Sequence, residues 1–466
     1  MPARLFLFLV VLVFSLSACV VEKAMHPAFP SPGHGRVFLY MSVPQPPGLD
    51  IRFTLTRVSF LNNLDQWIDV PLETEIKPER LVVNQIKIAE FGLIPGQYTK
   101  VKIVVSDPVL KLDQELISLT GPEIAAEVVN DLKFSLSRGE SLALFFEYRP
   151  DESMSGQDEF APVISVMLQG MELRDQLLYV SCSRSNSIII LDRQQDRVVG
   201  AAGVGRDPTG IVVGLNNDRV YVANRGSNNI SVVNTISNKV EKTISNLGYS
   251  PYQLALSRDG RRLFVTNSMH DNVTVIDTSR DLVVETISVE RNPTGIVHDP
   301  DRNLIYVANT NSNTISVIDV SSLQVVRTVP VDDLPVGVAV QEDKIYVANR
   351  GSSNITVIDL PSYKVEKSMP VGSGPSWVIS GPRDIIYLSR DYSNEIHVIY
   401  TPMSLVTHTI SVGQGPVHMY KDSWQRKLYV VNHKSDDITV IDMLTKKAIR
   451  NIQVGHRPQF IAAIEK

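Results

Sequence analysis

The sequence predicts an all-β protein, in which an N-terminal antiparallel β-sandwich is followed by a seven-bladed β-propeller closed by the C-terminal strand. A seven-fold repeat of about 42 residues fills the last three-fifths of the chain. Inside each repeat, short β-branched runs alternate with Asn/Ser/Gly turns, and none supports a helix. The preceding segment has strand-like runs without that period, so we expect a separate domain there.

The composition is that of a globular protein with room for two or three domains. The 466 residues are 43% hydrophobic and 20% charged. The net charge of -5 leaves no basic footprint for nucleic acid, so we exclude nucleic acid as a partner.

Residues 1–18 are typical of a secretory signal peptide. Arg4 precedes an apolar run over residues 5–16 that is too short to span a bilayer. Residues 16–19, Leu-Ser-Ala-Cys, resemble the bacterial lipobox, in which the cysteine is acylated and becomes the mature N-terminus. The alternative is an ordinary signal peptide that ends near a cysteine. We expect lipid on Cys19, because an exported chain would otherwise keep a terminal thiol without a role.

The lipid would make the membrane a partner of this protein. Residues 19–35 form a loose tether rich in Pro, Gly and His. Acyl chains contribute about 0.8 kcal/mol per buried methylene, and more than one chain makes the attachment stable. Val20 is not the aspartate that marks inner-membrane retention in the bacterial sorting rule. That resemblance implies the outer membrane, facing either the periplasm or the outside.

Residues 36–168 are predicted to form the sandwich. Strand-like runs cover residues 36–43, 51–61, 98–105 and 141–148, with Pro, Gly and Asp between them. Tyr98 follows a Pro-Gly turn, an arrangement in which a tyrosine hydroxyl pins a sandwich corner. The polar residues 149–162 are either a long hairpin loop or a hinge before a last strand over 163–168.

This segment resembles a prealbumin-like domain of uncharacterised function found in bacterial lipoproteins. The resemblance implies binding of carbohydrate or protein.

Two independent features keep the register of the repeat over residues 177–466. An aromatic residue recurs at intervals of 40 to 43 residues, at Tyr179, Tyr221, Phe264, Tyr306, Tyr346, Tyr387 and Tyr429. A proline recurs at the same intervals, at Pro208, Pro251, Pro293, Pro335, Pro375, Pro416 and Pro458. Each unit offers three strands before the proline and one after it, which matches a propeller blade.

The ends of the repeat predict how the ring closes. The first copy begins at Leu177 with what would be the second strand of a blade, whereas the last copy ends with an extra strand over residues 459–466. We expect this strand to become the innermost strand of blade 1, because strand exchange covers edges that would otherwise template aggregation.

The repeats resemble the YVTN family of seven-bladed β-propellers, with motifs such as "YVAN", "VID" and a glycine-proline turn over residues 177–466. The resemblance is specific for the fold and not for the function. Similar propellers include lactonases, lyases and the haem-binding domain of a nitrite reductase. The resemblance therefore leaves open an enzyme or cofactor-binding protein of the periplasm.

Residues that recur in most repeats are expected to hold the scaffold, since a site needs one copy and not seven. Asparagines at strand ends and aspartates before the next turn are predicted to bond backbone N–H groups in Asx turns. These residues are Asn224, Asn267, Asn309, Asn349 and Asn432, and Asp192, Asp277, Asp319, Asp359 and Asp442. Gly210, Gly295 and Gly337 are expected to permit positive φ or a close backbone approach near the axis.

The pattern breaks on three neighbouring blades. Where three of the other blades have Gly210, Gly295 and Gly337, these have Trp377, His418 and Phe460. Their loops between the second and third strands hold Arg184, Arg390, Tyr392, His433 and Lys434. One interpretation is a shallow site for an anionic or sugar-like ligand. The other is divergence near the closure point, with Trp377 and Phe460 plugging the channel. Arg225 and Arg350 are interpreted as solvated loop cations.

Motifs for metal, haem and nucleophilic catalysis are absent from the sequence: there is no HxxxH, HxH, CxxCH or GxSxG. We therefore predict no cofactor and no metal site, and interpret His397 and His408 as surface residues. Cys182 replaces a repeat asparagine and is expected to be a buried, inert thiol. The sequence favours a lipid-anchored, non-catalytic binding scaffold of the cell envelope whose partner is an envelope protein or polysaccharide.

Overall fold

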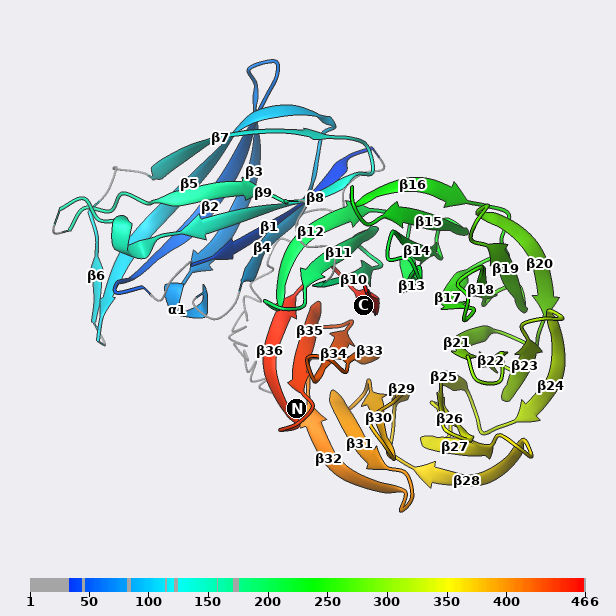
Figure 1. Cartoon of the computed structure of the whole chain (residues 1–466). Coiled ribbons are helices and arrows are strands. Elements are labelled where there is room, and N and C mark those ends of the chain that lie inside the picture. Colours follow the sequence, from blue (N-terminus) through cyan, green and yellow to red (C-terminus); the bar gives the residue numbers. More distant parts are fainter. Residues whose placement is uncertain are drawn as a thin grey trace, which may run out of the picture.

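The computed structural model describes residues 33–43, 47–81, 85–113, 115–120, 125–156, 158–170 and 176–464. Over these residues the chain forms two sheets of a sandwich and seven four-stranded sheets arranged in a ring (Figure 1). The predicted signal peptide, Cys19 and most of the tether lie outside the described residues. None of the helices within the described ranges is long and apolar enough to cross a membrane.

The sandwich is built from β1 to β9. One sheet has the order β4 (Ile86–Leu93), β1 (Gly35–Ser42), β8 (Ser141–Tyr148) and β9 (Ile164–Leu168). The other has β3 (Trp67–Ile76), β2 (Asp50–Asn62), β5 (Gly96–Leu112) and β6 (Glu115–Ser118), with β7 (Ala126–Leu136) also paired to β5. A short helix, α1 (Pro78–Leu81), and a 3-10 turn, Pro150–Glu152, complete it.

One strand pair departs from the antiparallel arrangement that we predicted, because β1 and β8 run parallel. Parallel neighbours need a long crossover, which strands β2 to β7 supply between them. Of the two alternatives for residues 149–162 the hairpin holds, since β9 returns antiparallel beside β8 with Ile164 opposite Tyr148. The pinned corner is confirmed: the Tyr98 hydroxyl donates to the Ile94 carbonyl at 2.5 Å.

The seven blades follow the predicted repeat. Blade 1 consists of β37 (Pro458–Ala463), β10 (Leu177–Cys182), β11 (Ser187–Asp192) and β12 (Arg197–Gly203), and blade 2 of β13 (Pro208–Val213), β14 (Arg219–Asn224), β15 (Asn229–Asn234) and β16 (Lys239–Ile244). Blade 3 consists of β17 (Pro251–Leu256), β18 (Arg262–Asn267), β19 (Asn272–Asp277) and β20 (Leu282–Ser288), and blade 4 of β21 (Pro293–Asp299), β22 (Leu304–Asn309), β23 (Thr314–Asp319) and β24 (Gln324–Pro330).

Blade 5 consists of β25 (Pro335–Gln341), β26 (Lys344–Asn349), β27 (Asn354–Asp359) and β28 (Lys364–Pro370). Blade 6 consists of β29 (Pro375–Ser380), β30 (Ile385–Arg390), β31 (Glu395–Tyr400) and β32 (Leu405–Ser411). Blade 7 consists of β33 (Pro416–Asp422), β34 (Lys427–Asn432), β35 (Asp437–Asp442) and β36 (Lys447–Gln453). We call the side with the turns between second and third strands the top face. The opposite side, with the turns between first and second strands and between third and fourth strands, is the bottom face.

The predicted closure of the ring is confirmed. β37 pairs antiparallel with β10, placing Ile461 opposite Val180, so the strand from the end of the repeat becomes the innermost strand of blade 1. Side chains of blade 7 reinforce this junction from outside, because Lys427 Nζ and the Tyr429 hydroxyl contact the Asp196 carboxylate at 2.7 and 2.8 Å.

The repeated aspartates and asparagines stabilise the blades in different ways. The Asp192 carboxylate accepts hydrogen bonds from the backbone N–H groups of residues 194 and 195, which confirms its Asx turn. For the asparagines the predicted Asx turn was wrong. Asn224 instead donates its amide N–H groups across the hairpin, to the Asn229 side chain at 2.8 Å and the Ser231 hydroxyl at 2.9 Å. The buried amide faces the next strand, where the polar side chains five and seven residues ahead accept its hydrogen bonds.

The repeated glycines permit close approach and not positive φ. A Cβ on Gly210 would lie 2.6 Å from the Tyr252 carbonyl oxygen, and one on Gly295 would lie 2.2 Å from that of Val336. Neither residue adopts a left-handed backbone. At these two glycines the inner strands of adjacent blades therefore leave no space for a side chain.

The sandwich packs on blades 1 and 7 through β1, which is buried on both faces. Val37 and Leu39 face the sandwich core, while Phe38 and Tyr40 pack with residues of β10, β34 and β35. β12 is the outer strand of blade 1 and lies next to β8 (Figure 1). It carries Gly-Ala-Ala-Gly at residues 200–203, and a Cβ on Gly203 would collide with the backbone of Gly139. Small residues thus let the two domains touch.

Candidate functional site

Three aromatic side chains meet at the centre of the ring. Trp377, His418 and Phe460 come from the inner strands of blades 6, 7 and 1, and their ring centroids lie 4.7 to 5.5 Å apart. Tyr252 from blade 3 approaches Phe460 edge-on at 5.7 Å. Trp377 and Phe460 are only 6% and 4% exposed. The sequence correctly grouped the three residues, and the structure places them as a plug inside the channel.

His418 is neutral within this plug. Burial lowers the pKa of His418 to about 3, and its Nδ1 accepts a hydrogen bond from the Ile461 backbone N–H at 3.4 Å. An uncharged imidazole fits the aromatic cluster, since a buried charge without a partner would be costly.

A cavity of about 420 Å³ lies on the bottom side of the plug. Its lining includes Trp377, His418 and Gln253 in the channel, and Arg302 and Glu342 on the turns of blades 4 and 5. The plug therefore lies between the top face and a cavity of mixed polar and apolar lining on the bottom side.

The rim of the top face gathers a second group of residues. The Tyr392 ring is 61% exposed, with the Arg350 guanidinium 5.2 Å and the Lys434 ammonium 5.8 Å from its centroid. Arg350 also forms an ion pair with the buried carboxylate of Asp391. Arg350 is an exposed loop cation, as interpreted from the sequence, and it is also held by the adjacent blade. Its position on blade 5, next to the divergent blade 6, was the available signal.

Burial shapes the protonation of two groups at this rim. Burial, with nearby Lys434, Arg457 and Arg350, lowers the pKa of His433 to about 4, so His433 is neutral at pH 7. Burial raises the pKa of Asp391, although Arg350 acts in the opposite direction. The exposed rim is thus an aromatic ring beside cations, with its carboxylate turned inward.

Arg390 and Arg184 lie apart from the rim group. Arg390 is mostly buried and donates to the Glu395 carboxylate at 2.9 Å, and its Nη1 lies 2.9 Å from His397 Nε2. His397 is buried, so its interpretation as a surface residue was wrong, whereas His408 is exposed. Arg184 is exposed on blade 1, where its backbone N–H donates to the His456 carbonyl at 3.2 Å.

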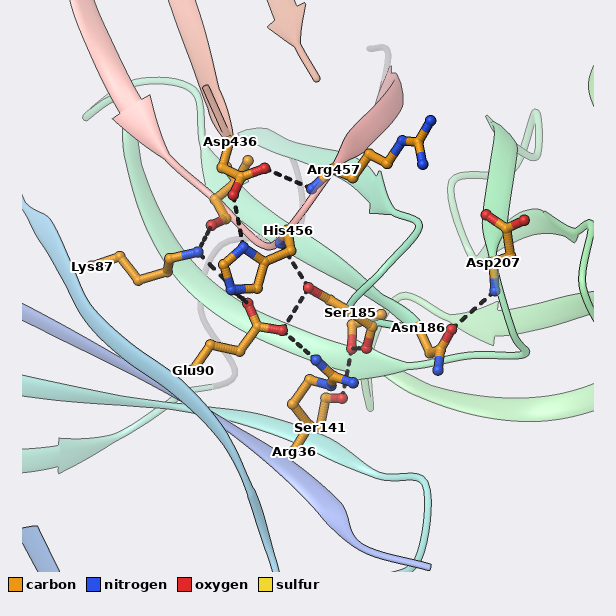
Figure 2. Close-up of polar contacts among 12 residues, drawn as sticks. Arg36, Lys87, Glu90, Ser141, Ser185, Asn186, Asp207, Asp436, His456 and Arg457 are labelled. Atoms are coloured by element: carbon orange, nitrogen blue, oxygen red, sulfur yellow. Dashed lines mark hydrogen bonds and ion pairs between the residues drawn. The ribbon is translucent and has the colours of Figure 1, made fainter. Parts of the chain in front are cut away.

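A charged cluster between the domains was missed by sequence reasoning (Figure 2). Glu90 of the sandwich forms an ion pair with Arg36 and accepts a hydrogen bond from the Ser185 hydroxyl of blade 1 at 2.6 Å. His456 of the closing loop lies between Glu90, at 3.5 Å, and Asp436, at 2.7 Å. Nothing in the repeat marks these residues, because their partners come from the other domain.

This cluster keeps its carboxylates ionised. Burial alone would raise the pKa of Glu90, but Lys87, His456 and Arg36 bring it below its usual value. Lys87 also donates to the Val454 carbonyl at 2.6 Å, so the sandwich is bonded to the loop that leads into β37. Cys182 is a buried free thiol beside this interface, and burial raises its pKa, as its predicted inertness requires. Within the described ranges no three His, Cys, Asp or Glu side chains gather as metal ligands.

Comparisons with known proteins agree with this fold. Residues 297–383 match the model of the YNCE-like β-propeller family. Hydrazine synthase of Kuenenia stuttgartiensis is similar over 58% of this chain and 93% of its own, with 20% identity and a TM-score of 0.52. A functionally unknown protein from Desulfotomaculum acetoxidans DSM 771 is similar over 62% and 99%, with 12% identity and a TM-score of 0.56.

At these identities the two structures are informative about the fold alone. No curated protein matches this sequence. The ring of seven four-stranded sheets shows that the C-terminal part of this chain is a seven-bladed β-propeller, and residues 297–383 are similar to the YNCE-like propellers.

Proposed function

We propose that this protein is a lipid-anchored, non-catalytic binding scaffold of the bacterial cell envelope, and that its propeller binds an anionic partner on the top face. The observation that carries this proposal is the exposed Tyr392 ring between Arg350 and Lys434. An aromatic face can stack on a sugar ring, while neighbouring cations pair with carboxylate or phosphate groups. An acidic envelope protein or polysaccharide presents both kinds of group.

The rim is ordered before any partner arrives. The ion pair with Asp391 holds the Arg350 guanidinium, and Gly374, at a φ of +75°, lies where a Cβ would touch both Asp391 and Tyr392. A surface whose side chains are already held loses less conformational entropy on binding. Because the channel beneath the rim is filled by the aromatic plug, we expect the ligand to lie across the rim and not to enter the ring.

Photocrosslinking in intact cells tests the top face. A photoreactive phenylalanine analogue replaces Tyr392, and the control places it at Tyr249, an exposed tyrosine of the same face in the loop between blades 2 and 3. We expect a discrete adduct from position 392 that is lost when Lys434→Ala is added. The same adduct from both positions, or none from position 392, would remove the rim from consideration.

The envelope location is supported by residues 16–19 and by Val20. Cys19→Ala is expected to move the protein from the membrane fraction to the soluble fraction, because the acyl chains would be missing. Continued membrane association of this variant would contradict the lipid anchor without affecting the proposal for the rim.

A further inference from the structure

The bottom face of blades 6 and 7 exposes three large apolar side chains, which lie on three turns of these neighbouring blades. Met403 is 74% exposed on the turn after the third strand of blade 6, and Trp424 and Leu444 are 86% and 72% exposed on the two turns of blade 7. Single exposed apolar residues are common, but a group of three on neighbouring turns indicates an interaction surface.

A groove of about 820 Å³ lies between these two blades. Its apolar lining comes from Pro382, Ile385 and Tyr400 of blade 6 and from Met443 and Leu444 of blade 7. Trp424 stands on the turn that also carries Ser423 and Arg426, both of which line the groove.

The groove lies at a blade junction where an apolar and a cationic residue occupy two positions that form an ion pair at two other junctions. At the junction of blades 2 and 3, Arg219 begins the second strand and pairs at 3.3 Å with Asp281, four residues after the next blade's turn aspartate. At the junction of blades 7 and 1, Lys427 and Asp196 occupy the same two positions and pair at 2.7 Å.

Within residues 176–464, the junction of blades 6 and 7 lacks this ion pair, as four other junctions do. Ile385 stands at the basic position and Lys446 at the acidic position. Tyr400 further replaces the turn aspartate of blade 6. Ile385 and Tyr400 thus contribute apolar surface to one groove.

The charge around the groove favours an acidic occupant. Three cationic side chains, Arg383, Lys421 and Arg426, line it together with a single carboxylate, Asp384. Arg383 and Arg426 are exposed at its edge. Carboxylates on a partner would find complementary charge there, while an apolar side chain would bury surface against Tyr400 and Met443.

We propose that this groove binds an extended acidic segment of a partner protein, with apolar side chains between Tyr400 and Met443 and carboxylates toward Arg383 and Arg426. A concave site between two turns fits a chain segment better than a bilayer, which requires a surface that protrudes. This site is on the opposite face from the Tyr392 rim, and the two proposals stand independently.

A synthetic peptide of four Glu-Leu repeats with a fluorescent label is the probe, and its anisotropy is measured with the purified protein. We expect saturable binding that weakens at least tenfold with Arg426→Glu, and at least fivefold with Leu444→Ser. Leu215→Ser, an exposed leucine on the turn between the first and second strands of blade 2, is the matched control and leaves binding unchanged. A peptide of Lys-Leu repeats should bind at least tenfold more weakly.

Three outcomes would overturn the proposal. The first is no saturable binding, or equal loss in Leu215→Ser and Leu444→Ser. The second is Trp424-dependent binding to vesicles of phosphatidylglycerol without peptide binding, which would assign the surface to a membrane. The third is a dimer in sedimentation that Leu444→Ser abolishes, which would assign it to a second copy. All substituted residues are exposed, so matching thermal melts verify that each variant folds.

Discussion

Arg390 donates to the Glu395 carboxylate at 2.9 Å, along the same path by which the Asn349 amide of blade 5 reaches the Asn354 side chain, also at 2.9 Å. Blade 6 thus keeps the cross-hairpin connection of the repeat and changes its chemistry. The second contact is changed in the same way: Arg390 contacts His397, which takes the place of the threonine that Asn349 contacts in blade 5. The divergence of blade 6 at this position is compensated within one hairpin.

We expect Arg390→Ala to destabilise the protein by about 1.5–3 kcal/mol, because it removes a charge-assisted bond and leaves Glu395 without its partner. Chemical denaturation measures the loss. The triple variant Arg390→Asn, Glu395→Asn, His397→Thr restores the blade 5 pattern and should recover most of it. If the triple variant is as unstable as Arg390→Ala, the compensation is not contained in this hairpin.

Glu90→Ala should destabilise the contact between sandwich and propeller by about 3–5 kcal/mol, since Arg36 is left buried without its carboxylate. Tryptophan fluorescence follows unfolding in urea. We expect one transition to become two, because the domains lose their shared cluster. Glu73→Ala, at an exposed position on β3, serves as the control. A single unshifted transition in Glu90→Ala would show that the apolar contacts alone couple the domains.

Stability should fall in acid partly because of His418. Its pKa of about 3 in the folded protein lies below the value of about 6.5 in the unfolded chain. Between these values the unfolded state binds the proton more readily, so folding free energy is lost as the pH falls, by up to about 1.4 kcal/mol per pH unit. His418→Phe should reduce this slope between pH 6 and 4 in urea titrations. An identical slope in both proteins would contradict a neutral imidazole at this position.

Gly295→Ala should lower the melting temperature clearly, because the new Cβ would lie 2.2 Å from the Val336 carbonyl oxygen and the inner strands would have to move apart. Overpacking of this kind costs about 1–3 kcal/mol. Gly214→Ala is the matched control, since its nearest neighbour lies at 3.5 Å, and it should change stability little. Equal effects of the two substitutions would argue against tight packing at the axis.

The ring and its closure could be predicted because a periodic sequence repeats its register. Tyr179 and Pro458 already place β10 and β37 in one blade before any coordinate is known. The aromatic plug followed from the same register. Its burial did not, because whether Trp377 points into the channel or out of the top face depends on the size of the surrounding side chains.

The contact of Arg350 with Tyr392 and the domain interface could not be predicted, for a different physical reason. Arg350 meets Tyr392 only through loop conformations that no periodicity describes. Glu90 meets His456 only after two domains with unrelated patterns have docked. The one readable trace was the Gly-Ala-Ala-Gly run of β12, whose counterparts on the other blades include charged residues such as Lys242. Small residues there indicate that another segment packs against β12, but they do not indicate which segment.

The bond between Ser181 and Phe460 joins residues that are 279 positions apart. Blade 1 can therefore be completed only after six other blades have been synthesised, and until then the inner edge of β10 stays bare. Such non-local pairing slows folding and exposes a chain to mispairing while it waits. A newly synthesised copy would thus depend on chaperone protection for longer than its local hairpins suggest.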